Sequence, residues 1–359
     1  MSPLLRSFRV PAALCVCALR GTAAPAVQTL DLAGEALLAD DITIEAYHVD
    51  YQHDRGPWSL SLGLGSNRYG LDYVNTLFAS SARLEESTWL ADLAATRRWG
   101  THAEATLGVR AYDGVADYRS LWLAEYYRET WFAFPAYRAP DPGGEAVNLS
   151  TTWHYAPGAG SLEAALDLGR DRVVPAWAFD PFLGRPVSSR KELNTVTGLV
   201  RWEQALNGWL KTALAVTHRT TSERDSRVGL DHSWAASAGP VALRLSGGYA
   251  EEAPTFDSTY GGAALEWRFQ PSWTLTTRYR VYRDSGEIAE STFTASAPAL
   301  DSQETSVGLL WERPTVDLSV SVGWLDTDYA PLTTENSFFG ALYRDRDWVH
   351  LRAAATFRF

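Results

Sequence analysis

The chain ends on the stretch "DWVHLRAAATFRF", residues 347–359, and this stretch decides the fold. Every second side chain is apolar, and most of those between them are polar, a pattern typical of a β-strand with two different faces. The final residues of a soluble domain are usually frayed and polar, so a strand that runs to a terminal phenylalanine needs another explanation. The apolar face consists of Val349, Leu351, Ala353, Ala355, Phe357 and Phe359.

The same alternation recurs along the chain, as in "WSLSLGLG" (58–65), "VNLSTTWHY" (147–155) and "VDLSVSVGW" (316–324). Short turns alternate with longer polar loops, which predicts an up-and-down antiparallel meander. The sequence shows no helical periodicity of useful length. The expected strands span 42–54, 57–65, 68–78, 84–99, 102–112, 146–155, 161–170, 192–203, 208–218, 227–236, 240–250, 259–269, 272–283, 303–312, 315–326 and 347–359.

Two architectures fit this meander, a soluble β-sandwich and a transmembrane β-barrel. Strands of about ten to twelve residues exceed the usual five or six and match a tilted bilayer crossing. Tryptophans also recur beside the short turns on the apolar face, as in the aromatic girdle of a membrane barrel; in the alternative, they fill one end of a sandwich core. These features favour an all-β transmembrane barrel of about sixteen strands, or fourteen if the weak first strands merge. The predicted periplasmic girdle comprises Trp99, Trp153, Trp202, Trp234, Trp267, Trp273 and Trp311.

The N-terminal residues 1–26 are typical of a secretory signal peptide, with a short basic region, an apolar stretch too short to span a bilayer and a small-residue cleavage site. Both cysteines of the chain lie inside this segment, so the exported protein would hold no disulfide or thiolate site. Residues 27–41 are expected to be a periplasmic N-terminal segment, and 42–359 the barrel. The net charge of −11 argues against nucleic acid as a partner.

The last residues, "RAAATFRF", resemble the C-terminal assembly signal of bacterial outer-membrane β-barrels. The polar position is Arg352, the aromatic positions are Phe357 and Phe359, and Ala354 stands where glycine is usual. This resemblance implies insertion by the bacterial barrel assembly machinery and a place in the outer membrane, in contact with lipid and lipopolysaccharide. It names no specific porin family.

In such a barrel the polar face of each strand lines the lumen, and charges there bias which solutes pass. The favoured function is therefore a porin-like channel for passive diffusion of small hydrophilic solutes. The alternative is a closed structural or binding barrel whose loops contact an extracellular partner. The pore-lining candidates are Arg110, Arg201, Arg244, Arg268, Arg278, Arg280, Glu104, Glu163, Asp167, Glu266, Asp317 and Arg352.

Catalysis finds little support, because none of the seven histidines accompanies a serine in a recognisable nucleophile motif. We therefore expect no catalytic residue, and a barrel enzyme that acts on lipid remains the weakest of three hypotheses. No histidine spacing indicates a metal site, and we expect no cofactor.

The longest loop, 113–145, contains the aromatic-rich run "YRSLWLAEYYRETWFAFPAY" (118–137). So many aromatic rings are not expected to remain in water. Either the loop folds into the mouth of the barrel or packs over its rim, or a pair of strands extends beyond the membrane.

Overall fold

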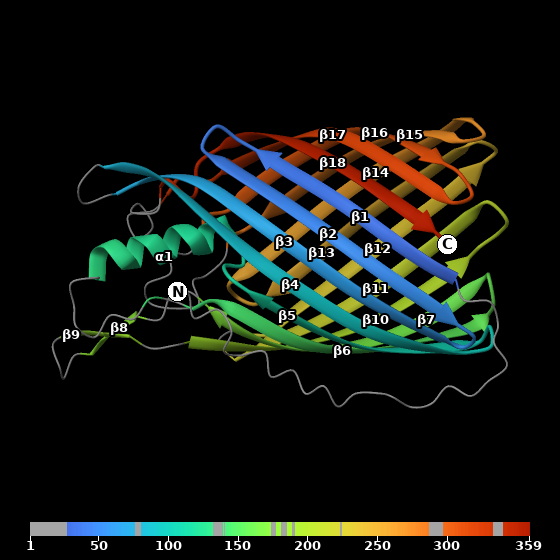
Figure 1. Ribbon diagram of the computed structural model, residues 1–359, viewed down its shortest axis with the longest axis horizontal. Helices are drawn as coiled ribbons and strands as arrows, with labels where there is room; N and C mark the ends of the chain where they lie inside the picture. Colours follow the sequence, from blue (N-terminus) through green and yellow to red (C-terminus); the bar gives the residue numbers. More distant parts are fainter. Residues whose placement is uncertain are drawn as a thin grey trace.

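The computed structural model describes residues 27–75, 80–131, 139, 141–173, 177–180, 185–188, 191–222, 225–286, 297–332 and 340–359. The expected signal peptide lies outside these residues. Sixteen strands form one closed antiparallel barrel (Figure 1). They are β1 (Val27–Leu38), β2 (Ile42–Arg55), β3 (Trp58–Val74), β4 (Ser81–Trp99), β5 (Ala103–Asp113), β6 (Gly143–Ala156), β7 (Gly160–Val173), β10 (Lys191–Ala205), β11 (Leu210–Thr221), β12 (Arg227–Ala238), β13 (Val241–Glu252), β14 (Phe256–Gln270), β15 (Trp273–Asp284), β16 (Leu300–Glu312), β17 (Val316–Tyr329) and β18 (Arg346–Arg358).

Each barrel strand pairs with its neighbour in the chain, and β18 closes the ring on β1. Phe357 lies opposite Leu30, and the backbone amide of Phe359 donates to the carbonyl of Gln28 at 2.9 Å. The terminal strand therefore has no free edge, which explains why the chain ends on an ordered apolar run.

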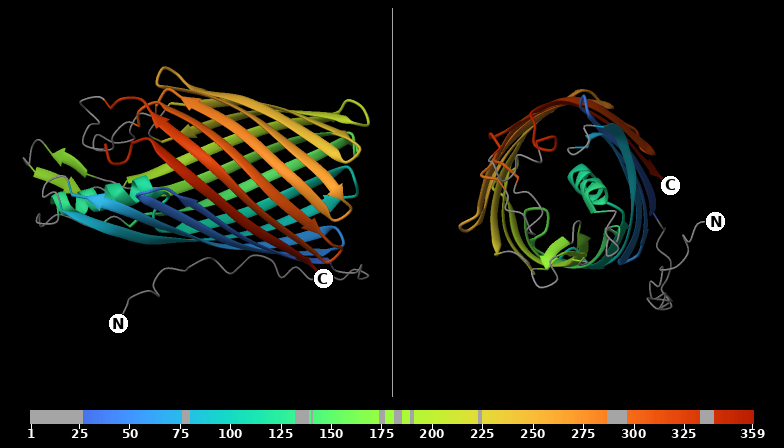
Figure 2. Two further views of the ribbon diagram at one scale, coloured as in Figure 1. Left: turned by 90° about the horizontal axis from the view of Figure 1, so that it is seen from above. Right: turned by 90° about the vertical axis from the view of Figure 1, so that its left-hand side faces the viewer.

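The connections differ at the two ends of the barrel. Only short turns join strands at the end where β18 finishes (Figures 1 and 2). The other end holds the longer connections, together with two three-residue turns, between β1 and β2 and between β13 and β14. That second end also holds helix α1 (Tyr118–Trp131) and a small separate sheet of β8 (Trp177–Asp180) and β9 (Arg185–Ser188). Among the described residues, no helix is both long and apolar enough to cross a bilayer.

Two predictions about the first strands were wrong. Residues 27–38 are not a periplasmic segment but strand β1, paired on both sides with β2 and β18. The alternation there is faint, because Gly34 and Ala36 occupy outward positions between larger apolar residues. The ring of Tyr47 on β2 covers the outer surface that Gly34 leaves without a side chain, since a Cβ on Gly34 would lie 3.6 Å from that ring.

The segments predicted as 57–65 and 68–78 form the single long strand β3. The run Gly65-Ser66-Asn67 has the composition of a turn, but all three residues continue the ladder between β2 and β4. The sixteen strands counted in the sequence thus agree with the structure because one missed strand offsets one divided strand.

Candidate functional site

The inside of the barrel is identified by helix α1, which lies within the outline of the ring when the barrel is viewed from its long-loop end (Figure 2). Tyr69, Leu71 and Tyr73 of β3 are buried against this helix, so these positions face inward. The register then fixes the inward positions around the closed ring. The opposite positions carry large apolar side chains that are exposed to the outside, such as Leu64 and Val320.

This outer face forms a belt of exposed apolar side chains around the barrel. Leu62, Val109, Leu149, Val200 and Val320 are each at least 40% exposed. A soluble protein rarely leaves such a contiguous apolar surface in water. The belt therefore faces lipid, as in a transmembrane barrel.

All of the pore-lining candidates occupy inward positions of the register, at heights that range from the short turns to the middle of the barrel. They come from β5, β7, β10, β13, β14, β15, β17 and β18, as the pairing shows for Glu104, Arg110, Glu163, Asp167, Arg201, Arg244, Glu266, Arg268, Arg278, Arg280, Asp317 and Arg352.

Those candidates that form ion pairs lie near the short turns. Arg268 Nη2 lies 3.1 Å from Glu312 Oε2, and Arg201 Nη2 lies 3.3 Å from Glu203 Oε2. The remaining two pairs are Arg98–Glu104 and Arg358–Asp317.

Five other inward arginines differ, because Arg110, Arg244, Arg278, Arg280 and Arg352 form no ion pair with any described residue. Arg244 lies near a short turn, at the start of β13, and the other four lie further along their strands. All five are exposed although they point into the barrel, so they border open space. Arg280 lies over the ring of Tyr260, with Cζ 5.9 Å from the ring centroid.

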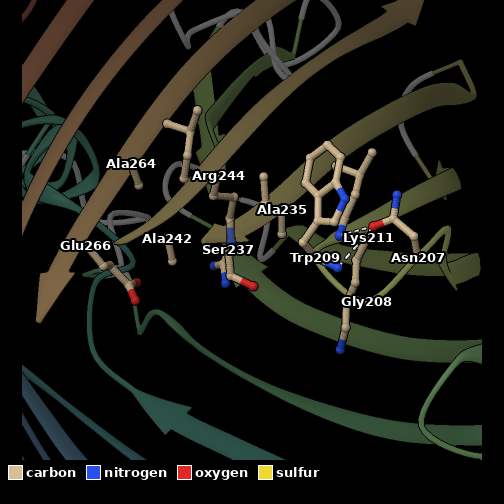
Figure 3. A pocket seen from close by; sticks show the side chains of 13 residues that line it. Asn207, Gly208, Trp209, Lys211, Ala235, Ser237, Ala242, Arg244, Ala264 and Glu266 are labelled. Atoms are coloured by element: carbon tan, nitrogen blue, oxygen red, sulfur yellow. Dashed lines mark hydrogen bonds between the residues drawn. The ribbon is translucent and has the colours of Figure 1, made fainter. Parts of the chain in front are cut away.

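A hollow of about 130 Å³ opens on the inner wall at the short-turn end (Figure 3). Lys211 of β11, Arg244 of β13 and Glu266 of β14 line it, together with small residues such as Ala235 and Ser237. Trp209 also lines the hollow, so its wall combines charged, small and aromatic side chains (Figure 3).

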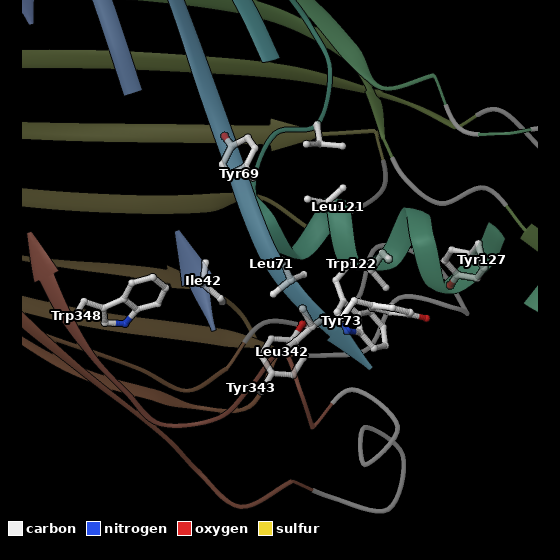
Figure 4. Close-up of a cluster of buried hydrophobic side chains, with 12 residues drawn as sticks. Ile42, Tyr69, Leu71, Tyr73, Leu121, Trp122, Tyr127, Leu342, Tyr343 and Trp348 are labelled. Atoms are coloured by element: carbon white, nitrogen blue, oxygen red, sulfur yellow. The ribbon is translucent and has the colours of Figure 1, made fainter. Parts of the chain in front are cut away.

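At the other end, helix α1 narrows the mouth. Its Leu121, Trp122 and Tyr127 pack on β3, and Leu342 and Tyr343 cover the same cluster from the segment before β18 (Figure 4). Trp122 and Leu342 are fully buried, at 0% exposure. Of the two alternatives for loop 113–145, the described residues 113–131 therefore agree with the first, because helix α1 is folded into the mouth. The sequence interpretation found no helical periodicity of useful length, and helix α1 was therefore not among the expected elements.

Hydrogen bonds fix the start and the end of the helix. Asp117 caps its N-terminus, since its Oδ1 accepts from the amide of Ser120 at 2.7 Å. The Tyr69 hydroxyl donates to the carbonyl of Ala116 at 2.9 Å, and the Tyr73 hydroxyl donates to Glu129 Oε2 at 2.9 Å. The helix is thus attached to one wall of the lumen.

A buried ion pair holds the segment before β18. The Arg346 guanidinium donates Nε to Asp41 Oδ1 and Nη2 to Asp41 Oδ2, both at 3.0 Å, and its side chain is only 3% exposed. It also donates to the carbonyls of Ala341 and Leu342. We call Asp41, Arg344 and Arg346 the mouth latch, with Arg344 Nη2 at 2.6 Å from Asp41 Oδ2. No sequence pattern indicated this pairing of residues 305 positions apart.

The mouth latch predicts a dependence on pH. Burial alone would raise the pKa of Asp41, but hydrogen bonds from Arg346 and Arg344 outweigh it and hold that pKa below its ordinary value of 3.8. The stabilisation by Asp41 is therefore complete above the ordinary value and is lost as the pH falls through the lowered one. We expect protease cleavage near the latch to rise only in strong acid. Asp41→Asn should remove this rise in cleavage at low pH. If the variant were cleaved with the same pH dependence as the native barrel, the role of Asp41 would be contradicted.

The predicted girdle tryptophans all occupy outward positions close to the short turns. Trp153 is 57% exposed, and the Trp202 Nε1 donates to the Tyr155 hydroxyl at 2.8 Å. Trp273 and Trp311 face each other across β15 and β16, with ring centroids 6.2 Å apart. Trp209, which is 56% exposed in a short turn, is not one of this row, because it lines the hollow at the short-turn end (Figure 3).

No protein-family model matches the chain, and no curated protein matches its sequence. Its fold is similar to the solved structure described as "Bacterial polysaccharide outer membrane secretin", with a TM-score of 0.52, 9% identity and coverage of 92% of this chain and 98% of that one. "CdiB from Acinetobacter baumannii" gives a TM-score of 0.54 and 10% identity over 92% of this chain, which spans only 60% of that one. These similarities show the fold, that of bacterial outer-membrane β-barrels.

Proposed function

We propose that this outer-membrane barrel is a passive channel for small hydrophilic solutes, with a charged lumen and a mouth narrowed by α1. The observation that supports it best is the exposure of Arg110, Arg244, Arg278, Arg280 and Arg352, all of which point inward. Arginines without an anionic partner are costly to bury, so their environment must be water. A sixteen-stranded barrel is wide enough for an aqueous lumen.

The lumen charges favour some solutes over others. Glu163 and Asp167 of β7 point into the lumen from one part of the ring, and Arg278 and Arg280 of β15 from another. Opposite signs across a narrow aqueous space create a transverse field that orients and selects dipolar solutes. Such a field is strongest where the charges form no ion pair, as in this part of the lumen.

One observation favours the alternative of a closed binding barrel. Helix α1 is buried in the mouth and attached to the wall by hydrogen bonds from Tyr69 and Tyr73. The described contacts of the helix, however, lie on the side formed by β2, β3, β4, β17 and β18. A passage along β11 to β15 is compatible with them.

Two further roles rest on the same barrel. We infer that the outward tryptophans near the short turns lie at the headgroup level of the inner leaflet, where amphipathic rings are favoured. We also infer that Arg352, Phe357 and Phe359 are read by the barrel assembly machinery before β18 pairs with β1. Phe359 remains 72% exposed in the folded barrel.

Ion selectivity tests the channel proposal. In a planar bilayer with a potassium chloride gradient, the double variant Arg278→Glu, Arg280→Glu should shift the reversal potential toward cation preference, because two positive charges of the wall become negative. Arg283→Glu is the matched control, since Arg283 lies on the same strand but faces outward, paired with Asp301. Equal reversal potentials in the two variants would contradict the assignment of these arginines to the pore wall. A folded barrel that passes no current would favour the closed alternative.

A further inference from the structure

A second group of polar side chains lies on the lumen wall, away from the basic strands. His48 and Asp50 of β2 and Asp92 of β4 each offer one ligand atom, and these atoms all lie within 4.8 Å of one another. His48 Nε2 is 2.8 Å from Asp50 Oδ2. An imidazole nitrogen and two carboxylate oxygens are a common donor set for divalent transition metals.

The strand between them makes this convergence possible. Asp50 lies opposite Gly63 of β3, and Gly63 lies opposite Asp92, so the three residues form one row across three strands. Neighbouring strands stand about 4.8 Å apart, so the backbones of Asp50 and Asp92 are roughly 10 Å apart. Their ligand atoms meet only because the residue between them has no side chain.

The glycines of β3 clear the space for these side chains. A Cβ on Gly63 would lie 2.3 Å from Asp92 Oδ2, which is inside van der Waals contact. A Cβ on Gly65 would lie 3.0 Å from His48 Nδ1 and 2.7 Å from Leu90 Cδ1. The wall therefore holds a shallow cradle, with donors on two sides and the lumen above.

The charge of the cradle also favours a bound cation, although Arg110 of β5 lies opposite Asp92 in the register. Among the described residues, no lysine or arginine forms an ion pair with Asp50 or Asp92. Two carboxylates close together repel each other unless a proton or a cation lies between them. The side chains of His48 and Asp50 are 37% and 41% exposed, so a hydrated ion can reach them from the lumen.

We propose that His48, Asp50 and Asp92 form a binding site for a divalent transition-metal ion, with zinc as the reference ion, on the lumen wall. Zinc takes three protein ligands and one water where a site is open. Its bonds of about 2.0–2.1 Å place neighbouring donors roughly 3.3 Å apart, which small rotations of these three side chains can reach. The site goes beyond the channel proposal and stands without it, because an ion can bind there whether or not solutes pass.

Calorimetric titration of the folded barrel with zinc chloride tests the site directly. We expect one saturable zinc per barrel, and Asp92→Asn and His48→Gln should each weaken binding at least about tenfold. Asp167→Asn and His154→Gln are the matched controls, because they change inward residues of β7 and β6 outside the cradle, and they should bind as the native barrel does. Heat-modifiable migration confirms that each variant has folded.

A positional variant separates this site from general attraction of cations to the acidic chain. Gly63→Ala keeps all three ligands but pushes the Asp92 carboxylate away, so zinc should bind roughly tenfold more weakly. An excess of calcium should not displace the zinc, because the imidazole favours the softer ion. Absence of saturable binding, or equal affinity in the native barrel, His48→Gln and Gly63→Ala, would overturn the proposal.

Discussion

Replacing Asp41 by alanine is expected to lower the free energy of unfolding by about 3–5 kcal/mol, because it leaves the buried Arg346 without a counter-ion. The Arg346 guanidinium would keep its bonds to the carbonyls of Ala341 and Leu342 but lose its bidentate carboxylate. The segment that carries Leu342 and Tyr343 would then separate from Trp122 more easily. Urea titration of the refolded barrel measures the loss, and increased current noise would report the looser mouth.

Asp40→Ala provides the matched control, since Asp40 is the exposed neighbour of Asp41 and is not part of the mouth latch. A double-mutant cycle with Arg346→Ala isolates the interaction between the two side chains. If Asp41→Ala and Asp40→Ala had the same stability, the buried pair would contribute nothing to the mouth.

Replacing Val320 by arginine is expected to cost about 2–4 kcal/mol, because the charge would enter the lipid near the middle of the bilayer. Val320 of β17 is 58% exposed on the apolar belt and lies between Leu309 and Ala353 of the adjacent strands. It lies further from the girdle than Leu318, which pairs with Trp311. The unfolding free energy in lipid vesicles is the measurement.

Ser319→Arg is the control for this change, because Ser319 is the preceding residue and faces the aqueous lumen. The same charge should be tolerated there. Equal destabilisation at Val320 and Ser319 would mean that the assignment of the lipid-facing and lumen-facing sides is wrong. The proposed aqueous lumen would then be wrong as well.

The sequence predicted the faces of most strands, because alternation at period two carries over directly into the register of a closed barrel. It failed where the outward residues are small. Gly34 and Ala36 are the small outward residues of β1, which was missed. Ser66 is the small outward residue at the point where β3 was divided, and it lies between Tyr47 and Trp89 of the adjacent strands. In both strands the neighbours supply the missing apolar surface, and a single-strand pattern does not contain that information.

The helix in the mouth was missed for a different reason. An amphipathic helix is identified by one apolar stripe, but α1 is covered on most sides. Leu121, Trp122 and Leu123 are consecutive buried residues, and of residues 118–129 only Arg128 is exposed. A helix that is enclosed by a lumen wall and a loop has apolar residues on several sides, so its sequence shows no single apolar stripe.

The candidate site shows the same limit. The alternation of polar and apolar residues within β15 was enough to place its arginines in the lumen, because that pattern can be read from a single strand. The zinc cradle needs three strands in a defined register, with glycine in the middle one. The pair His48 and Asp50, two positions apart on one inward face, is the only local sign of it.

Single-channel current across a planar lipid bilayer, recorded with the refolded protein, tests the central claim most directly. We predict stable conductance steps in the native barrel, because exposed arginines border an aqueous lumen beside α1. We also predict larger steps in Asp41→Ala, as the mouth loosens. A folded, heat-modifiable barrel that never conducts, in either the native form or this variant, would contradict the open lumen and identify a closed barrel.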